Sequence, residues 1–179
     1  MVETPRELGI GFSDQWIDVP TSGDVKAGKV HAWWIPGPTM DAPAILFFHG
    51  NAGSISSNIR YVQKFHALGF GVLMIDYRGY GKSTSALPSE NSVYADARAA
   101  WDRFVLLTPK ARKRMVYGHS LGGAVAIDLA TKVDGVDALI EEGSFTSLVA
   151  IARTVMPSWM PLSLMAQIPG WLWTMGRLR

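Results

Sequence analysis

Cysteine is absent from this sequence, and histidine occurs only four times in 179 residues. The lack of cysteine excludes a disulfide framework, a thiolate metal site and a cysteine nucleophile. It also fits a protein that resides in a reducing compartment. We therefore predict no metal centre, and any covalent catalysis must use another nucleophile.

Charged residues are sparse, at 18% of the chain, and the formal net charge is only +2. The basic residues are scattered except for one cluster within residues 110–114, which is typical of a solvated loop before a strand. Nucleic acid is therefore not an expected partner. The N-terminus has no basic segment followed by an apolar run, so no signal peptide is predicted. We expect a cytoplasmic protein, which could still contact a membrane from its surface.

An unbroken membrane-spanning run is lacking as well. Residues 155–176 carry no charge and include three tryptophans, but Pro157, Pro161 and Pro169 would interrupt a spanning helix repeatedly. We expect residues 153–179 to form an apolar tail of broken helical segments that packs on the domain or over a pocket. Contact of this tail with a membrane surface is the alternative.

The rest of the chain alternates between strand-like and helix-like segments. Two β-favouring runs, 15–19 and 30–35, flank a turn-rich segment and predict an antiparallel hairpin. Continuous apolar runs then predict strands buried on both faces. These runs lie at residues 44–48, 71–75, 115–117 and 138–140. Apolar residues at helical spacing predict helices at 56–68, after a capping Ser89, and up to about residue 132.

Such a rhythm predicts right-handed βαβ crossovers and therefore an α/β fold. We expect a mainly parallel sheet of about six strands, with helices on both faces and an antiparallel N-terminal hairpin. No internal repeat or interdomain linker is evident, so residues 1–179 should form a single domain.

Ser120 is the candidate nucleophile. It lies in Gly118-His119-Ser120-Leu121-Gly122, which matches the pattern G-x-S-x-G. The pattern alone is weak, but here an apolar strand precedes it and a helix opening with small residues follows it. In that setting the serine sits on a strained turn, and glycines keep the flanking backbone clear of the neighbouring strand and helix.

An oxyanion hole requires two N–H donors that converge beside the nucleophile. One donor should be the N–H of Leu121, at the start of the helix after Ser120. The second should come from the loop after the strand at 44–48, which reads His49-Gly50-Asn51-Ala52-Gly53. We assign it to the N–H of Asn51, with Ala52 as the competitor.

Two further motifs have structural interpretations. His49, at the end of a buried strand, should brace the loop that follows it, although it could also support catalysis. The segment 76–83 ends in Gly-Lys-Ser, but a phosphate-binding P-loop needs glycine where Asp76 stands, so nucleotide binding is rejected. Asp76 and Arg78 should instead tie loops together under the site.

Together these pieces resemble the α/β-hydrolase superfamily, and more closely its Bem46-like branch, near the α/β-hydrolase domain-containing 12 and 13 type. The resemblance covers residues 4 to about 165 and rests on four blocks, at 49–53, 76–83, 118–123 and 142–147. It implies hydrolysis of an ester, thioester or amide through an acyl-serine intermediate, with no metal or organic cofactor. It also implies a small acyl-ester or lipid-like substrate.

The sequence departs from the family order of serine, then acid, then histidine. All four histidines precede Ser120, whereas Glu142, at the end of the last strand, could supply an acid, since some relatives place theirs there. We therefore expect a partial α/β-hydrolase fold whose last two strands are missing, from a truncated or frameshifted reading frame. The alternatives are a non-catalytic binding or scaffold protein and a membrane-associated one. The last strand would leave an exposed sheet edge, through which the chain could self-associate.

Overall fold

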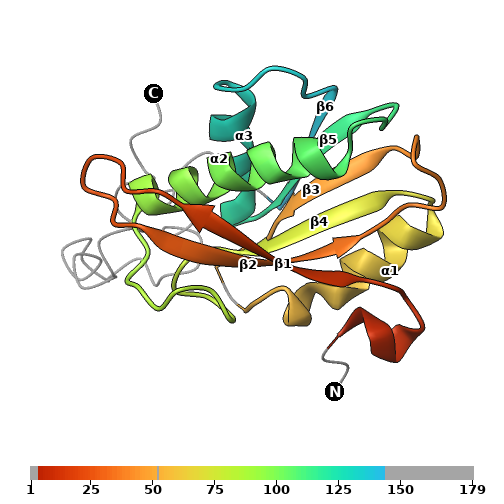
Figure 1. Cartoon of the computed structure of the whole chain (residues 1–179), viewed down its shortest axis with the longest axis horizontal. Coiled ribbons are helices and arrows are strands. Elements are labelled where there is room, and N and C mark those ends of the chain that lie inside the picture. The colour runs from red at the N-terminus through yellow and green to blue at the C-terminus, as the bar shows by residue number, and fades with distance from the viewer. Residues whose placement is uncertain (1–3, 52, 144–179) are drawn as a thin grey trace, which may run out of the picture.

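The computed structural model describes residues 4–51 and 53–143, which form an α/β fold (Figure 1). The expected tail at 153–179 lies outside the described residues. The strands of the described part are β1 (Ser13–Val19), β2 (Gly28–Ile35), β3 (Ala44–Phe48), β4 (Gly71–Asp76), β5 (Arg114–His119) and β6 (Ala138–Glu142). Its helices are α1 (Ile59–Ala67), α2 (Glu90–Leu107) and α3 (Leu121–Ala130), with short 3-10 helices at Pro5–Leu8 and Ser56–Asn58.

Within residues 4–143, the strands form one sheet in the order β1-β2-β4-β3-β5-β6. β2 pairs antiparallel with β1 on one side and with β4 on the other. β4, β3, β5 and β6 run parallel to one another. The predicted α/β class, the mainly parallel sheet and the antiparallel N-terminal hairpin are thus confirmed.

Both faces of the sheet are covered by helices, as the unbroken apolar run of β3 requires. Leu46 and Phe48 belong to a core shared with α2 and α3, whereas Ile45 and Phe47 belong to a second core shared with α1. Figure 1 shows α2 and α3 on one side of the sheet and α1 on the other. Because successive side chains of a strand point to opposite faces, a strand with two covered faces has no polar side.

Local signals in the sequence set several element boundaries. Ser89 caps α2, since its side chain accepts a hydrogen bond from the Ser92 N–H at 3.2 Å. The predicted helix at 56–68 is divided into a 3-10 turn, Ser56–Asn58, and α1. Among the described residues, no helix combines the length and the apolar character that crossing a bilayer would require.

The parallel strands bring the candidate residues to one edge of the sheet. Asp76 and Glu142 end β4 and β6, while His49 and Ser120 directly follow β3 and β5. Because parallel strands have their carboxyl ends on the same side, these four residues gather there although they are far apart in sequence. Ligands of open α/β sheets bind at this edge.

Candidate active site

The turn at Ser120 joins β5 to α3 in a strained backbone conformation. Ser120 has φ 54° and ψ −115°, and no other non-glycine residue of the described part has a positive φ. Such a conformation costs roughly 1–3 kcal/mol and persists only where the surroundings hold it. Here the Ser120 N–H donates to the Glu142 carbonyl at 2.9 Å, and the Gly123 N–H donates to the Ser120 carbonyl at 2.9 Å. The hydroxyl does not cap α3, and the residue is partly exposed.

The glycines around Ser120 are required by close backbone packing. A Cβ atom at Gly122 would lie 2.1 Å from the Phe48 carbonyl oxygen, and one at Gly118 would lie 2.2 Å from the Gly122 carbonyl oxygen. Both distances are far below van der Waals contact. The first turn of α3 can therefore approach β3 and β5 only without side chains at these two positions.

The loop after β3 packs against this turn. A Cβ at Gly50 would lie 3.3 Å from the Cβ of Ser120 and 3.2 Å from Nδ1 of His119. The next residue, Asn51, is exposed, and its Oδ1 accepts a hydrogen bond from the Tyr80 hydroxyl at 2.6 Å. The structure thus brings the loop that carries Asn51 to the turn that carries Ser120. The competing donor, Ala52, lies outside the described residues.

Leu121 occupies the first position of α3, with its side chain buried. The first N–H groups of an α-helix have no acceptor inside the helix, and the positive end of the helix dipole lies there. The backbone beside Ser120 is therefore suited to stabilise negative charge on a substrate oxygen.

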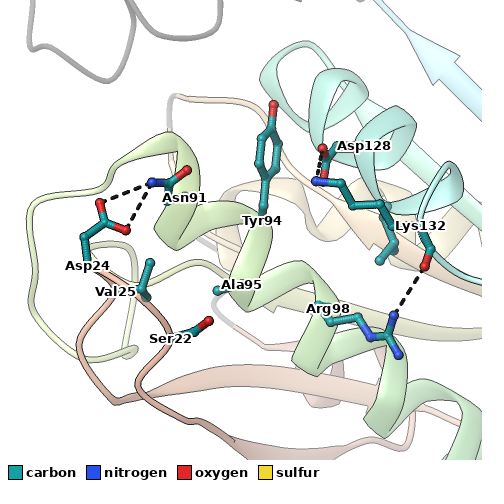
Figure 2. Close-up of a pocket in the computed structure, with 10 residues that line it drawn as sticks. Ser22, Asp24, Val25, Asn91, Tyr94, Ala95, Arg98, Asp128 and Lys132 are labelled. Atoms are coloured by element: carbon teal, nitrogen blue, oxygen red, sulfur yellow. Dashed lines mark hydrogen bonds and ion pairs between the residues drawn. The ribbon is translucent and has the colours of Figure 1, made fainter.

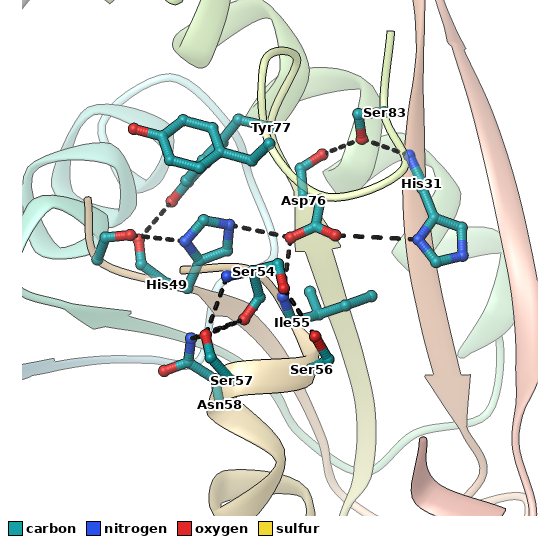
Figure 3. Close-up of polar contacts among 12 residues, drawn as sticks. His31, His49, Ser54, Ile55, Ser56, Ser57, Asn58, Asp76, Tyr77 and Ser83 are labelled. Atoms are coloured by element: carbon teal, nitrogen blue, oxygen red, sulfur yellow. Dashed lines mark hydrogen bonds and ion pairs between the residues drawn. The ribbon is translucent and has the colours of Figure 1, made fainter. Parts of the chain in front are cut away.

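His49 is fully buried and is engaged on both sides of its ring (Figure 3). Its Nδ1 lies 2.6 Å from the carbonyl oxygen of Gly50. Its Nε2 lies 3.3 Å from Oδ1 of Asp76, outside hydrogen-bond geometry. The carbonyl oxygen of His49 accepts a hydrogen bond from the Tyr77 hydroxyl at 3.2 Å. These contacts suit the bracing role that the sequence suggested for His49.

Asp76 is a buried carboxylate at the centre of this network. Its Oδ1 also accepts a hydrogen bond from the Ile55 N–H at 2.8 Å. Burial alone would raise the pKa of Asp76, but His31, His49 and the Ile55 N–H hold that pKa below its ordinary value. Only glycine fits at position 81, because a Cβ there would lie 1.8 Å from the Asp76 carboxylate. Asp76 therefore ties loops together. Arg78 connects a separate set of segments, since it pairs with Asp96 at 2.6 Å and donates to the carbonyl oxygens of Lys26 and Ser92.

Sequence reasoning missed His31. This buried side chain lies on β2, directly opposite Asp76 in the antiparallel pairing of β2 with β4. Its Nδ1 is 4.0 Å from Asp76 Oδ2, and its Nε2 is 2.6 Å from Asp14 Oδ1. Burial alone would lower the pKa of His31, but Asp76 and Asp14 raise it above its ordinary value. The one sign of His31 in the sequence is a histidine within the β-favouring run at 30–35.

Glu142 ends β6, and its carboxylate is held by phenol groups. Its Oε2 accepts hydrogen bonds from the Tyr61 hydroxyl, at 2.9 Å, and from the Tyr117 hydroxyl. These two bonds hold the pKa of Glu142 below its ordinary value. The three residues line a groove of about 530 Å³ between α1 and the end of β6. Glu142 is thus a neighbour of Ser120 through its backbone, while its side chain faces this groove.

Within the described part of the chain, no imidazole is hydrogen-bonded to Ser120. His31 and His49 are buried in the Asp76 network, and the ring of His119 lies beside that of Tyr61, with centroids 5.9 Å apart. Within residues 4–51 and 53–143, no group of three or more His, Asp or Glu side chains is arranged to hold a metal ion. The described part of the site thus consists of Ser120 on a strained turn, with the first N–H groups of α3 beside it.

A second hollow, of about 420 Å³, lies between the β1–β2 connection, α2 and α3 (Figure 2). Several of its polar groups pair with one another. The Asn91 amide donates to Asp24 at 3.1 Å, and Lys132 pairs with Asp128 at 2.6 Å. Ser120 does not line this hollow, so it is separate from the candidate site.

Residues 41–178 match the model of a family described as serine aminopeptidase, S33. The chain is 42% identical over 160 residues to protein bem46 of Schizosaccharomyces pombe, which covers 87% of the chain and 52% of that protein. It is 38% identical over 158 residues to the α/β hydrolase domain-containing protein WAV2 of Arabidopsis thaliana, covering 86% of the chain and 49% of that protein. The chain therefore spans about half the length of these curated relatives.

Two other similarities bear on chemistry and on fold. The lysophosphatidylserine lipase ABHD12 of Bos taurus is 32% identical over 146 residues, covering 78% of the chain and 36% of the lipase. Among solved structures, the esterase Pf2001 of Pyrococcus furiosus superposes with a TM-score of 0.69 at 24% identity. That superposition covers 96% of this chain and 61% of the esterase. At 24% identity it supports the fold alone.

Proposed function

Because this chain belongs to the α/β-hydrolase superfamily, in its Bem46-like branch, we propose that it is a serine hydrolase with Ser120 as the nucleophile. The strained backbone of Ser120 between β5 and α3 is the observation that carries the proposal. It sets the hydroxyl beside the N-terminus of a helix, where a serine can attack an acyl carbon and form an acyl-serine intermediate.

The negative charge that develops on the acyl oxygen would be stabilised by two backbone donors, the N–H groups of Leu121 and Asn51. Each such donor contributes about 10²–10³ to the rate in enzymes of this kind. Support comes from the position of Leu121 at the start of α3 and from the contact of Gly50 with Ser120. No metal or organic cofactor is required for this chemistry.

The proposed substrate class is a small acyl ester or a lipid-like ester. The bovine relative is named a lysophosphatidylserine lipase, which favours an ester with a long apolar chain. The uncharged, tryptophan-containing segment 155–176 is suited to contact a membrane surface where such a substrate would reside.

A serine hydroxyl needs a base, and no histidine follows Ser120 in this sequence. We therefore expect the 179-residue chain to hydrolyse p-nitrophenyl acetate very slowly, and a fluorophosphonate probe to label it weakly. Only the residual catalysis of binding and the oxyanion hole would remain. Of the described histidines, His49 is the first candidate for a supporting role, with Glu142 as the candidate acid.

The test uses added imidazole as an external base. The rate of p-nitrophenyl acetate hydrolysis is measured for the parent chain, for Ser120→Ala and for Ser13→Ala, at increasing imidazole concentration. Subtracting the Ser120→Ala rate removes direct catalysis by imidazole. We expect a Ser120-dependent rate that grows with imidazole and is unchanged in Ser13→Ala, whose serine is exposed on β1. Equal rates for the parent and Ser120→Ala at every concentration would contradict the proposal.

The alternative function is a non-catalytic binding or scaffold protein on a hydrolase fold. The observation that favours it is the burial of His31 and His49 in a network centred on Asp76 rather than on Ser120. Under this alternative, the chain would be folded and stable, but imidazole would produce no Ser120-dependent rate.

A further inference from the structure

Asp76 connects four segments of the chain that meet beneath the candidate site. Through its carboxylate it contacts the Ile55 N–H at 2.8 Å and His49 at 3.3 Å, and it faces His31 on β2 at 4.0 Å. Its own carbonyl accepts a hydrogen bond from the Ser83 hydroxyl at 2.5 Å, and Ser83 in turn accepts one from the His31 N–H at 2.8 Å. Figure 3 shows Asp76 between the two histidine rings.

His49 carries this connection to the loop beside Ser120. A carbonyl oxygen can only accept a hydrogen bond, so the short contact of His49 Nδ1 with the Gly50 carbonyl requires a hydrogen on Nδ1. The other nitrogen, Nε2, then faces the Asp76 carboxylate. The ring thus lies between a loop carbonyl, to which Nδ1 donates, and a buried carboxylate, which Nε2 approaches to 3.3 Å. Gly50, at the end of this path, packs against Ser120.

We propose that Asp76 is a positioning residue: together with His49, His31 and the Ile55 N–H, it forms a buried clamp that fixes the backbone of Gly50 and Asn51. We call these groups the Asp76 clamp. Its importance for chemistry rests on the proposed function, since the fixed backbone would carry the second oxyanion donor. The effect of the clamp on the backbone of Gly50 and Asn51 can be tested without measuring turnover.

The physical reason for such a clamp is the exposure of Asn51, whose position depends on what lies beneath the loop. Asn51 is exposed, and its side chain has a single partner, Tyr80, among residues 4–51 and 53–143. Oxyanion donors act only within a narrow range of positions, and a displacement of about 1 Å can reduce a rate by about 10²-fold. An exposed loop meets that requirement when a buried group on its inner side determines its position.

The test compares Asp76→Asn with Asp96→Asn. Asp96 is also a fully buried carboxylate, but it contacts Arg78, at 2.6 Å from Nε and 2.8 Å from the backbone N–H. Both variants lose a buried charge and should lower the melting temperature. Only Asp76→Asn should shift or broaden the NMR amide signals of Gly50 and Asn51. Equal effects of the two variants on these signals would overturn the clamp.

His31→Gln provides a second variant in case Asp76→Asn does not fold. His31 lies on the far side of Asp76 from the loop, and its ring faces the loop only across Asp76. We expect the Gly50 and Asn51 signals to move in His31→Gln in the same direction as in Asp76→Asn, by a smaller amount. Unchanged signals in a folded His31→Gln protein would contradict the continuity of the clamp.

The hydrolysis assay with imidazole separates this inference from the proposed function. If the clamp positions an oxyanion donor, the Ser120-dependent rate should fall about tenfold to a hundredfold more in Asp76→Asn than in Asp96→Asn. Absence of any Ser120-dependent rate in the parent chain would contradict the proposed function, and the NMR comparison would still decide whether the clamp exists.

Discussion

His31 turns both of its ring nitrogens toward carboxylates, those of Asp14 and Asp76. An ionised carboxylate only accepts hydrogen bonds, so the imidazolium form of His31 suits this environment better than the neutral ring. The pKa of His31 is accordingly raised above its ordinary value of 6.5, despite the burial that opposes it. The pKa of Asp76 is lowered below 3.8, despite its own burial.

The two shifts predict how stability depends on pH. Because the pKa of His31 is raised in the folded state, His31 contributes stability that is fully present below pH 6.5. This contribution is lost as the pH rises through the raised pKa. Because the pKa of Asp76 is lowered in the folded state, Asp76 contributes stability that is present above pH 3.8. That contribution is lost as the pH falls through the lowered pKa. We expect the joint contribution of His31 and Asp76 to the free energy of unfolding, measured with urea, to be greatest between these limits and to decline on the alkaline side.

The alkaline decline should depend on His31 itself. In His31→Gln, the free energy of unfolding should be lower near pH 6 and should change less between about pH 6 and pH 9. The control is His66→Gln, at an exposed position on α1, which should retain the decline of the parent chain. An undiminished alkaline decline in His31→Gln would show that other groups cause it.

At the scale of elements, the junction of β5 with α3 determines the geometry of the candidate site. Gly122 lies so close to β3 that a Cβ would meet the Phe48 carbonyl carbon at 2.6 Å as well as its oxygen. Both partners are backbone atoms of a central strand, which cannot move without disturbing its pairing with β4 and β5. The strained Ser120 is therefore held by elements that cannot easily relax.

Substitution of Gly122 should reveal this constraint. We expect Gly122→Ala to lower the free energy of unfolding by about 2–3 kcal/mol or more, in the range of overpacked cores. Gly11→Ala is the matched control, because a Cβ at Gly11 would have no atom within 4 Å and its φ is one that other residues adopt. Chemical denaturation of both variants measures the difference. A Gly122→Ala protein as stable as Gly11→Ala would show that the junction can give way.

The elements could be predicted from the sequence because their signals are local. The apolar run at 44–48, the cap at Ser89 and the glycines around Ser120 each indicate their structure within a few residues. The clamp could not be predicted in full, because His31 reaches Asp76 only through the pairing of β2 with β4, strands that residues 36–70 separate in the chain. Likewise, nothing near Glu142 in sequence indicated that the Tyr61 and Tyr117 hydroxyls would hold its carboxylate.

At the scale of the whole molecule, β6 forms one edge of the sheet of described residues. Leu139 and Ile140 on this strand are 40% and 37% exposed, and the groove lined by Tyr61, Phe65 and Leu68 lies nearby. An exposed apolar strand edge promotes association between chains. The predicted tail, residues 153–179, lies outside the described residues and is the segment that could cover this edge.

Self-association of the 179-residue chain is therefore expected, through β6. Ile140→Lys should shift the chain toward the monomer, because a charge on an edge strand opposes pairing with a second strand. The control is Leu106→Lys on α2, at a position 71% exposed and away from β6. Size-exclusion chromatography with light scattering gives the mass of each species. A parent chain that is monomeric at every concentration would contradict the prediction.

The strand order also has a consequence for biosynthesis. β3, on which the candidate site is built, pairs with β4 and β5, and both of these strands follow it in the chain. A nascent chain therefore exposes the run Ala44–Phe48 to solvent before either neighbour has left the ribosome. Short apolar β-forming runs of this kind are the segments that aggregate when they wait unpaired. Slower translation between the codons of β3 and β4 should thus lower the yield of folded protein, and a chaperone that binds apolar nascent segments should restore it.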